Sequence, residues 1–340
     1  MTVRLGALTI FAASLLLVPA AQAPSALAGS SRATPADGVP AFSNVFMIIG
    51  ENTTYGQVTK NTAPYLVNDF EPGAAWFTTY FALTHNSTAN YVGLTSGQYT
   101  RCEQVDNPPA KCHEHVDNLF TLLDRADESW TEWMESAKGP CDLVDSGSDA
   151  FLNKYRVKHN PAVYYGSVEG QGGHFSSTAP SRECLKNVVP AGSTAPNDTS
   201  ALDAALASGH VARFNLIIPN ECEDGHDACQ PRGPHMGKIR QFDEFLQREV
   251  PKIEASPAFN SSSVILIVYD ECDCEGLHGD PFYGGGQVVL ALKSGLINPG
   301  MYSGLLNHYS TLRMLQDGLG VSGTYLANAA TAAPIDMIWK

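Results

Sequence analysis

Four short runs of apolar residues stand out along the chain, and each has the length of one β-strand. They are residues 45–49, 214–218, 264–269 and 288–292. Apolar positions in these runs are continuous and do not alternate with polar ones, which is typical of strands covered by helices on both faces. The runs therefore predict buried strands of a mostly parallel sheet.

Between the runs lie segments with apolar residues at helical spacing. These are residues 116–125, 236–253 and 309–319, the last followed by Gly320 at a C-cap position. Strands that alternate with helices predict an α/β fold, a three-layer sandwich around a mostly parallel central sheet. The polar, Gly- and Ser-rich segment 141–196 has weak periodicity, and we predict that it crosses the sheet edge as substrate-contacting loops.

The N-terminus has the pattern of a secretory signal peptide. Arg4 precedes an apolar run at residues 5–18, and small residues follow up to Ala28. We predict a signal peptide at residues 1–28, a flexible linker at 29–40 and a single domain at 41–340. The alternative is an uncleaved membrane anchor, but the run falls short of the roughly 20 residues that a span needs. No later stretch is apolar enough to cross a bilayer, so we expect a secreted, soluble protein, and nothing demands more than a monomer.

Cysteine usage agrees with export. The 8 cysteines lie outside the leader, and an even number in an exported chain predicts up to four disulfides. The sequence leaves the pairing open, although 102 with 112, 141 with 184 and 222 with 229 are neighbours. A bridge between Cys272 and Cys274 would span a single residue and be strained, and a thiolate metal site is the alternative there.

The chain is acidic, with a formal net charge of −14 and no basic run. Such a chain is a poor partner for nucleic acid, because nothing would neutralise phosphates along a strand. It remains compatible with one small phosphate ester held by a metal ion.

Two of the predicted strands end in acids. Glu51 and Asn52 follow residues 45–49, and Asp270 and Glu271 follow residues 264–269. Ligands bind beyond the carboxyl ends of strands in an open parallel sheet, so these groups could converge on one site. A cation between them would relieve their repulsion, and oxygen ligands suit Mg, Ca or Mn. Ordinary solvated acids are the alternative interpretation.

A serine with candidate chemistry follows. Ser87 stands where a loop enters a predicted helix, so it would face free N–H groups and the positive end of the helix dipole. Those features favour a bound phosphate and stabilise an alkoxide, although a simple helix cap is the commoner role. Segment 218–227 adds Asp224 and His226 after another strand, and His308 opens the last helix. Either histidine could instead be structural.

In this order, the segments resemble a bacterial phosphoesterase family of the alkaline phosphatase superfamily. That family contains secreted acid phosphatases and phosphatidylcholine-hydrolysing phospholipases C, and the likeness extends to the small secreted acid phosphatases of mycobacteria. Its Glu-Asn-Arg/His-Ser/Thr signature corresponds to residues 51–54, and its Thr-His-Pro-Ser-x-Pro-Asn-Tyr segment to 84–91. Lys-His-x-Pro, Asn-Asp-x-His-Asp, Trp-Asp-Glu and His-Tyr-Ser correspond to 158–161, 223–227, 269–271 and 308–310.

The resemblance implies an alkaline phosphatase-like fold and a secreted, metal-dependent phosphomonoesterase that works through a phosphoserine at Ser87. It implies these metal ligands: Glu51, Asn52, Asp270 and Glu271, with Asp224 available for a second ion. Catalysis would also involve Asn90, His226 and His308, and substrate binding would involve Asn90, His85 and His159. The divalent ion would be Mg, Ca, Mn, Zn or Fe, one or two in number.

The chain departs from the family pattern at two places, which changes what we expect of the loop around Ser87 and of the contacts with substrate. Asn86 and Ala89 replace both prolines of the serine segment, so we expect a less rigid loop around Ser87. Thr53 replaces Arg/His in the first signature, which would alter contacts with substrate.

Two other functions remain as alternatives. One is phospholipase C-type cleavage of a phosphodiester, or phosphoinositide dephosphorylation, with a phospholipid head group as the partner in place of a small phosphate ester. The other is a catalytically silent, secreted binding module that keeps the fold. A sulfatase is disfavoured, because Ala89 and Tyr91 stand where the formylglycine segment needs Pro and Arg.

Overall fold

An eight-stranded sheet has the order β5-β4-β6-β1-β7-β8-β2-β9. Its centre consists of β6 (Phe214–Ile218), β1 (Val45–Gly50) and β7 (Val264–Tyr269), which are parallel and buried at every residue. These are three of the four predicted strands, and the prediction of an α/β fold with a mostly parallel sheet is confirmed. The fourth, β8 (Leu290–Ser294), begins two residues later than predicted and is antiparallel to β7.

The other strands are too short or too mixed in polarity to be recognised, and the sequence did not reveal them. On one side the sheet continues through β4 (Trp130–Met134) and β5 (Val188–Pro190), and on the other through β2 (Ala75–Phe77) and β9 (Gly300–Tyr302). A separate pair consists of β3 (Tyr80–Phe81) and β10 (Leu306–Asn307). Residues 141–196, for which the sequence predicted substrate-contacting loops over the sheet edge, also supply the edge strand β5 and a short helix, α3 (Arg182–Asn187).

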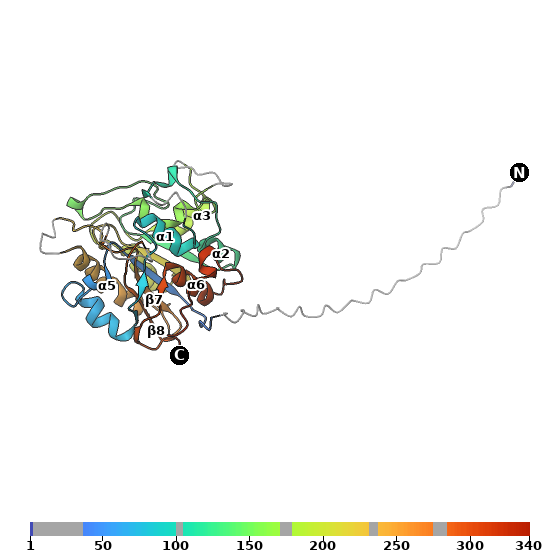
Figure 1. The fold of residues 1–340 in the computed structure, drawn as a ribbon. Helices are drawn as coiled ribbons and strands as arrows, with labels where there is room; N and C mark the ends of the chain where they lie inside the picture. The colour runs from blue at the N-terminus through green and yellow to red at the C-terminus, as the bar shows by residue number, and fades with distance from the viewer. Residues whose placement is uncertain (3–36, 100–104, 171–178, 231–236, 275–283) are drawn as a thin grey trace. The chain divides into compact units, whose positions relative to one another are not determined.

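Helices form two groups around the sheet. α1 (Ser87–Ser96) packs against α2 (Leu119–Arg125) and α6 (His308–Leu319), and α5 (Lys238–Glu254) packs against α4 (Ser200–Ser208). Figure 1 shows β7 and β8 between α5 on one side and α1, α2 and α6 on the other. The apolar stripe of α5 explains its position, because Phe242, Phe245 and Leu246 are fully buried.

Single turns of 3-10 or π helix connect these elements. They are Tyr55–Gln57, Leu66–Phe70, Glu71–Gly73, Pro109–Lys111, Asp149–Phe151, Val157–His159, Pro161–Tyr164 and Ala327–Ala330.

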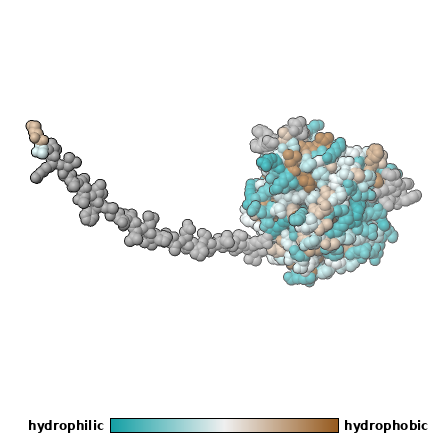
Figure 2. All heavy atoms as spheres, turned by 180° about the vertical axis from the view of Figure 1, so that it is seen from behind, coloured by the Kyte–Doolittle hydropathy of each residue, from teal (hydrophilic) through white to brown (hydrophobic). Residues whose placement is uncertain are grey.

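The computed structural model describes residues 1–2, 37–99, 105–170, 179–230, 237–274 and 284–340. Residues 33–340 form one compact unit, distinct from residues 1–32. Nearly all of the predicted signal peptide, and the linker up to residue 36, lie outside the described residues. Within the described ranges, no helix has both the length and the apolar character that a bilayer span requires. The surface seen in Figure 2 is largely hydrophilic, with small scattered apolar patches.

Disulfides join Cys141 to Cys184, Cys222 to Cys229, and Cys272 to Cys274. The first two match the neighbours suggested by the sequence. Cys112 is also in a disulfide, and Cys102 lies outside the described residues. Because Cys272 and Cys274 are bonded to each other, they do not offer the thiolate metal site that the sequence left open.

Candidate active site

Three buried acids follow three neighbouring parallel strands. Glu51 comes directly after β1, Asp224 follows β6, and Asp270 follows β7. The backbone joins their segments, because the Glu51 N–H donates to the Asp224 carbonyl at 2.7 Å and the Asp270 N–H to the Gly50 carbonyl at 2.9 Å. The convergence at the carboxyl edge of the sheet, which the sequence predicted, is therefore present.

Oxygen atoms in this cluster are buried without hydrogen-bond partners among the described residues. They are Glu51 Oε1, Asn52 Oδ1, Asp224 Oδ2 and Asp270 Oδ2. A native fold rarely leaves one such atom unsatisfied, and here four belong to residues that follow three adjacent strands. Oxygen donors of this kind are the ligands that a hard divalent cation prefers, so the cluster fits a metal ion.

The raised pKa values of the three carboxyl groups also favour a bound cation at this cluster. Burial, followed by the negative charges of Asp270 and Asp224, raises the pKa of Glu51 well above its ordinary value. Burial and the charge of Glu271 raise the pKa of Asp270 from 3.8 to about 8. Burial and the charge of Glu221 raise the pKa of Asp224. Three carboxylates in one buried place repel one another, and a cation would relieve that repulsion.

This repulsion predicts how the stability of the metal-free protein depends on pH. A carboxyl group whose pKa is raised by folding stabilises the fold while it is protonated, and this contribution is lost as pH rises through the raised pKa. For Asp270 that window runs from about 4 to about 8. When a chelator keeps the protein free of metal, we expect the Tm to fall by on the order of 5–10 °C as the pH rises through that range.

Thermal unfolding followed by circular dichroism, in chelator and with Mg²⁺ or Mn²⁺, measures this effect. A bound ion should remove most of the fall, because it stabilises the ionised carboxylates. A Tm in chelator that is flat or rises between about pH 4 and 8 would contradict the expectation.

His159 lies between two of these acids. Its Nε2 is 3.2 Å from Glu51 Oε1, its Nδ1 is 3.3 Å from Asp224 Oδ2, and its ring stacks on Tyr91. Burial, and then the positive charge of Lys158, lower its pKa well below the ordinary value, so the ring is neutral. The predicted role was substrate binding, but the ring faces the acid cluster and fits a metal ligand equally well.

Ser87 is the first residue of α1 and is 1% exposed. Its hydroxyl donates to Glu51 Oε2 at 3.1 Å, and Lys158 Nζ lies 3.4 Å from its Oγ. The predicted nucleophile thus touches the acid cluster on one side and a cation on the other. Burial alone would lower the pKa of Lys158, but nearby acids, led by Glu51, outweigh it and raise that pKa. Lys158 is therefore a cation beside the hydroxyl.

Hydrogen bonds from Asn90, which the sequence predicted to contact substrate, hold the loop before Ser87. Asn90 Oδ1 accepts from the N–H groups of Leu83 and Thr84, and its Nδ2 donates to the carbonyls of Thr84 and Asn86. Both polar atoms of Asn90 therefore hold the loop, whereas the sequence predicted contact with substrate. These four bonds lie in the loop that lacks both prolines of the family pattern.

Glu271 holds the same loop from the other side. Its Oε2 is 2.6 Å from His85 Nδ1, and its Oε1 accepts from the Asn86 N–H at 3.1 Å. Both oxygens are engaged, so in this structure Glu271 positions the loop, in contrast with its predicted role as a metal ligand. Thr53 contacts backbone rather than open space, because its hydroxyl donates to the Glu51 carbonyl.

His308 is fully buried and does not face the pocket. Its Nε2 is 2.6 Å from the Asp270 carbonyl oxygen, and its Nδ1 is 2.7 Å from the Tyr80 hydroxyl. Burial lowers the pKa of His308 to about 4. A neutral ring donates from Nε2 and accepts at Nδ1, so His308 fixes the backbone of Asp270. The predicted role in proton transfer or oxygen binding does not fit this position.

A polar pocket of about 220 Å³ opens beside Ser87. At one wall, His226 Nε2 lies 3.1 Å from Lys158 Nζ, and its Nδ1 lies 2.9 Å from Asp227. Buried Glu221 is 3.8 Å from Lys158 and also pairs with Arg156. The lining residues are Asn52, His85, Asn86, Ser87, Asp106, Lys158, His226, Glu271, Cys272 and Asp273.

Glu221, His226 and Asp227 lie close enough together to suggest a second metal site. Lys154 pairs with both Glu221 and Asp227, however, and Lys158 lies against His226. These cations already balance the acids, so the cluster is an ion-pair network.

Three residues of this site were missed by the sequence analysis: Lys158, Glu221 and Asp106. Lys158 stands beside His159 in the Lys-His-x-Pro segment, and Glu221 stands in the segment after β6. Both residues could therefore have been predicted from segments that the sequence analysis had already named. Asp106 had no such signal.

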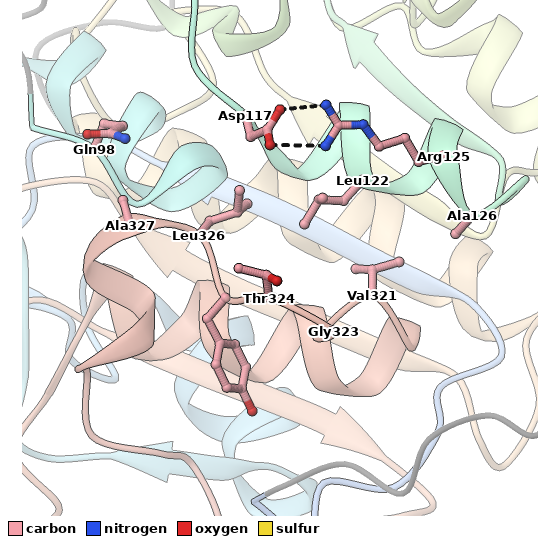
Figure 3. Close-up of a pocket in the computed structure, with 11 residues that line it drawn as sticks. Gln98, Asp117, Leu122, Arg125, Ala126, Val321, Gly323, Thr324, Leu326 and Ala327 are labelled. Carbon is pink, nitrogen blue, oxygen red and sulfur yellow. Dashed lines mark hydrogen bonds and ion pairs between the residues drawn. The ribbon is translucent and has the colours of Figure 1, made fainter.

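A larger pocket, about 540 Å³, lies at the other end of α1. Figure 3 shows the paired Asp117 and Arg125 at its edge, with Leu122, Thr324 and Leu326 close by. It includes Gln98, beyond the C-terminus of α1, so roughly the 15 Å length of that helix separates it from Ser87. It shares no lining residue with the pocket beside Ser87.

Comparisons with known proteins agree with this geometry. The strand order defines an α/β protein with a large, mostly parallel central sheet. A protein in the alkaline phosphatase superfamily from Vibrio parahaemolyticus has a similar fold, with a TM-score of 0.59 at 13% identity over 84% of this chain and 68% of that chain. More particularly, the chain belongs to the Phosphoesterase family, whose model matches residues 40–322. This membership places it among hydrolases that act on phosphoric ester bonds.

Curated relatives carry phosphatase names. A phosphatidylinositol-3-phosphatase from Mycobacterium tuberculosis is 24% identical over 308 residues, which is 89% of this chain and 85% of the relative. A probable acid phosphatase from Kluyveromyces lactis is 24% identical over 244 residues, 71% of this chain. The matched region spans only 50% of that yeast protein.

Proposed function

We propose that this chain is an exported, metal-dependent phosphomonoesterase that cleaves its substrate through a phosphoserine at Ser87. The observation that carries the proposal is the contact between the Ser87 hydroxyl and Glu51, whose other oxygen belongs to the cluster of unsatisfied buried acceptors. Export is supported by the disulfides, which form in oxidising compartments.

The ligands proposed for a divalent ion are Glu51, Asn52, Asp224 and Asp270, with His159 Nε2 as a nitrogen donor. Such an ion would supply Lewis-acid stabilisation of negative charge on the reacting oxygens. The chain's own groups determine the rest. Glu51 Oε2 holds the Ser87 proton, and the N-terminus of α1 and Lys158 provide positive potential where phosphoryl oxygens would lie.

The proposed reaction has two steps. In the first, Ser87 Oγ attacks phosphorus, its proton passes to Glu51, and the ester oxygen leaves with a proton from His226, the one imidazole among those described that lies beside Lys158 in the pocket. In the second, water displaces Ser87 from the phosphoserine: the water gives a proton to His226, Glu51 returns its proton to Ser87 Oγ, and phosphate is released. His85 and Asn90 keep the loop that carries Ser87 in place.

The size of the pocket favours a monoester. A volume of about 220 Å³ holds a phosphoryl group and little of what it is attached to, since drug-sized ligands need roughly 300–1,000 Å³. Cleavage of a phospholipid diester, the alternative reaction, needs room for a second ester group at phosphorus. The name of the mycobacterial relative makes a phosphoinositide monoester one substrate to include in a test.

Phosphate release by the purified chain tests the proposal directly. The substrates are a small phosphomonoester, a small phosphodiester, a phosphatidylinositol phosphate and phosphatidylcholine, each from acid to alkaline pH, with and without chelator. We expect turnover of the monoesters that chelator suppresses and a divalent ion restores. Turnover of diesters alone would replace the proposal with a phospholipase C-type activity. Absence of turnover under every condition would favour a silent binding module.

A further inference from the structure

Asp106 places a carboxylate inside the pocket, next to the proposed nucleophile. Its Oδ1 accepts from the Thr88 N–H at 3.0 Å, and Thr88 is the second residue of α1. Its Oδ2 lies 3.8 Å from Lys158 Nζ. The side chain is 26% exposed, and the backbone has a φ of +48°, a conformation that side-chain-bearing residues rarely adopt. Those contacts hold the carboxylate over the start of α1.

Both partners of Asp106 are groups that a phosphoryl oxygen would also seek. A free N–H at a helix N-terminus binds anions, and Lys158 Nζ is 3.4 Å from Ser87 Oγ. A phosphorus atom that Ser87 attacks must come within about 3–3.5 Å of Oγ. Its oxygens would then compete with the Asp106 carboxylate for Lys158 and for the Thr88 N–H.

We propose that Asp106 is an internal anion that occupies part of the phosphoryl position and weakens the binding of phosphate at Ser87. This inference rests on the proposed function, because it matters to catalysis only if Ser87 attacks a phosphoryl group. The carboxylate acts through its charge, and because the repulsion grows with the charge of the ligand, it acts strongly on free phosphate, the product of the proposed reaction.

A direct test is calorimetric titration of inorganic phosphate into the wild-type chain and Asp106→Asn. Titrations are made at one pH, in chelator and with Mg²⁺, Mn²⁺ or Zn²⁺. Asparagine keeps the acceptor for the Thr88 N–H and caps a helix as well as aspartate does, so the fold should persist. We expect phosphate to bind Asp106→Asn at least about tenfold more tightly, because one nearby like charge is gone.

Two further variants complete the design. Asp117→Asn removes the same charge from an ion pair at the other end of α1, and it should leave phosphate affinity unchanged. Lys158→Met should weaken phosphate binding in both the wild-type and the Asp106→Asn background. Thermal unfolding of each variant identifies any that have lost the fold.

The inference is overturned by equal or weaker phosphate binding in folded Asp106→Asn, or by absence of phosphate binding in both proteins. Its failure is distinguishable from failure of the proposed function, because the titration does not depend on turnover. Tighter phosphate binding by Asp106→Asn without hydrolysis of any ester would support the anion position and reject the phosphatase. Hydrolysis of an ester, together with unchanged phosphate affinity in Asp106→Asn, would support the phosphatase and reject the anion position of Asp106.

Discussion

Ser87→Ala is expected to lower kcat/KM for phosphomonoesters by at least about 10⁴-fold, because loss of a covalent nucleophile removes the two-step route altogether. The hydroxyl lies at the N-terminus of α1, donates to Glu51 and stands 3.4 Å from Lys158 Nζ. Among the described residues that line the pocket, Ser87 is the only one with a hydroxyl group. Binding groups remain in the variant, so a small residual activity over water is expected.

Two measurements separate loss of the nucleophile from general damage. Phosphate release gives the rate, and mass spectrometry of acid-quenched protein detects a phosphorylated Ser87 peptide in the wild type. The matched control is Ser96→Ala, the same change at the buried C-terminal end of the same helix, where the hydroxyl donates to the Val92 carbonyl and accepts from the Gln98 N–H. Ser96→Ala should keep its activity. If Ser87→Ala kept more than about 1% of the wild-type rate, another residue would be the nucleophile.

Glu51→Gln is expected to abolish binding of the divalent ion and to lower kcat by about 10³-fold, since charge stabilisation by a metal contributes several kcal/mol. The variant has a second, less obvious phenotype. Burial, and then the charges of Asp270 and Asp224, raise the pKa of Glu51. Removing one charge relieves this repulsion, so in chelator Glu51→Gln should be at least as stable as the wild type at neutral pH.

Metal content by inductively coupled plasma mass spectrometry, and Tm with and without Mg²⁺ or Mn²⁺, measure both effects. Glu132→Gln is the control. Glu132 is also fully buried, and burial raises its pKa, but it lies in the middle of β4 opposite Leu216 and accepts from the Ala162 N–H. Its replacement should leave metal content unchanged. Glu51→Gln that still bound the ion and lost stability in chelator would show that Glu51 has a structural role.

The centre of the fold was predictable because β1, β6 and β7 are buried on both faces and therefore have continuous apolar sequences. Once those strands are parallel neighbours, the acids after them must share one edge, which is why the positions of Glu51 and Asp270 followed from the sequence. β4, with Thr and Glu within it, and the three-residue strands carry too little pattern to be recognised.

Roles within the site were harder to predict than positions. A motif gives the type of side chain but not the direction in which it points. Asn90 and His308 stand in recognisable segments, yet Asn90 turns back to its own loop and His308 reaches the Asp270 backbone. Asp106 meets the start of α1 through the Thr88 N–H, 18 residues earlier in the chain, and no local pattern encodes such a contact.

The manner in which Asn90 holds the loop has a consequence for temperature. A proline restricts a chain through covalent geometry, so its effect persists at all temperatures, whereas the four bonds from Asn90 to residues 83–86 are bonds that water competes for on heating. The position of Ser87 therefore depends on hydrogen bonds that weaken on heating. Warming should loosen this loop before the sheet beneath it melts, so heat inactivation and global unfolding become separate events.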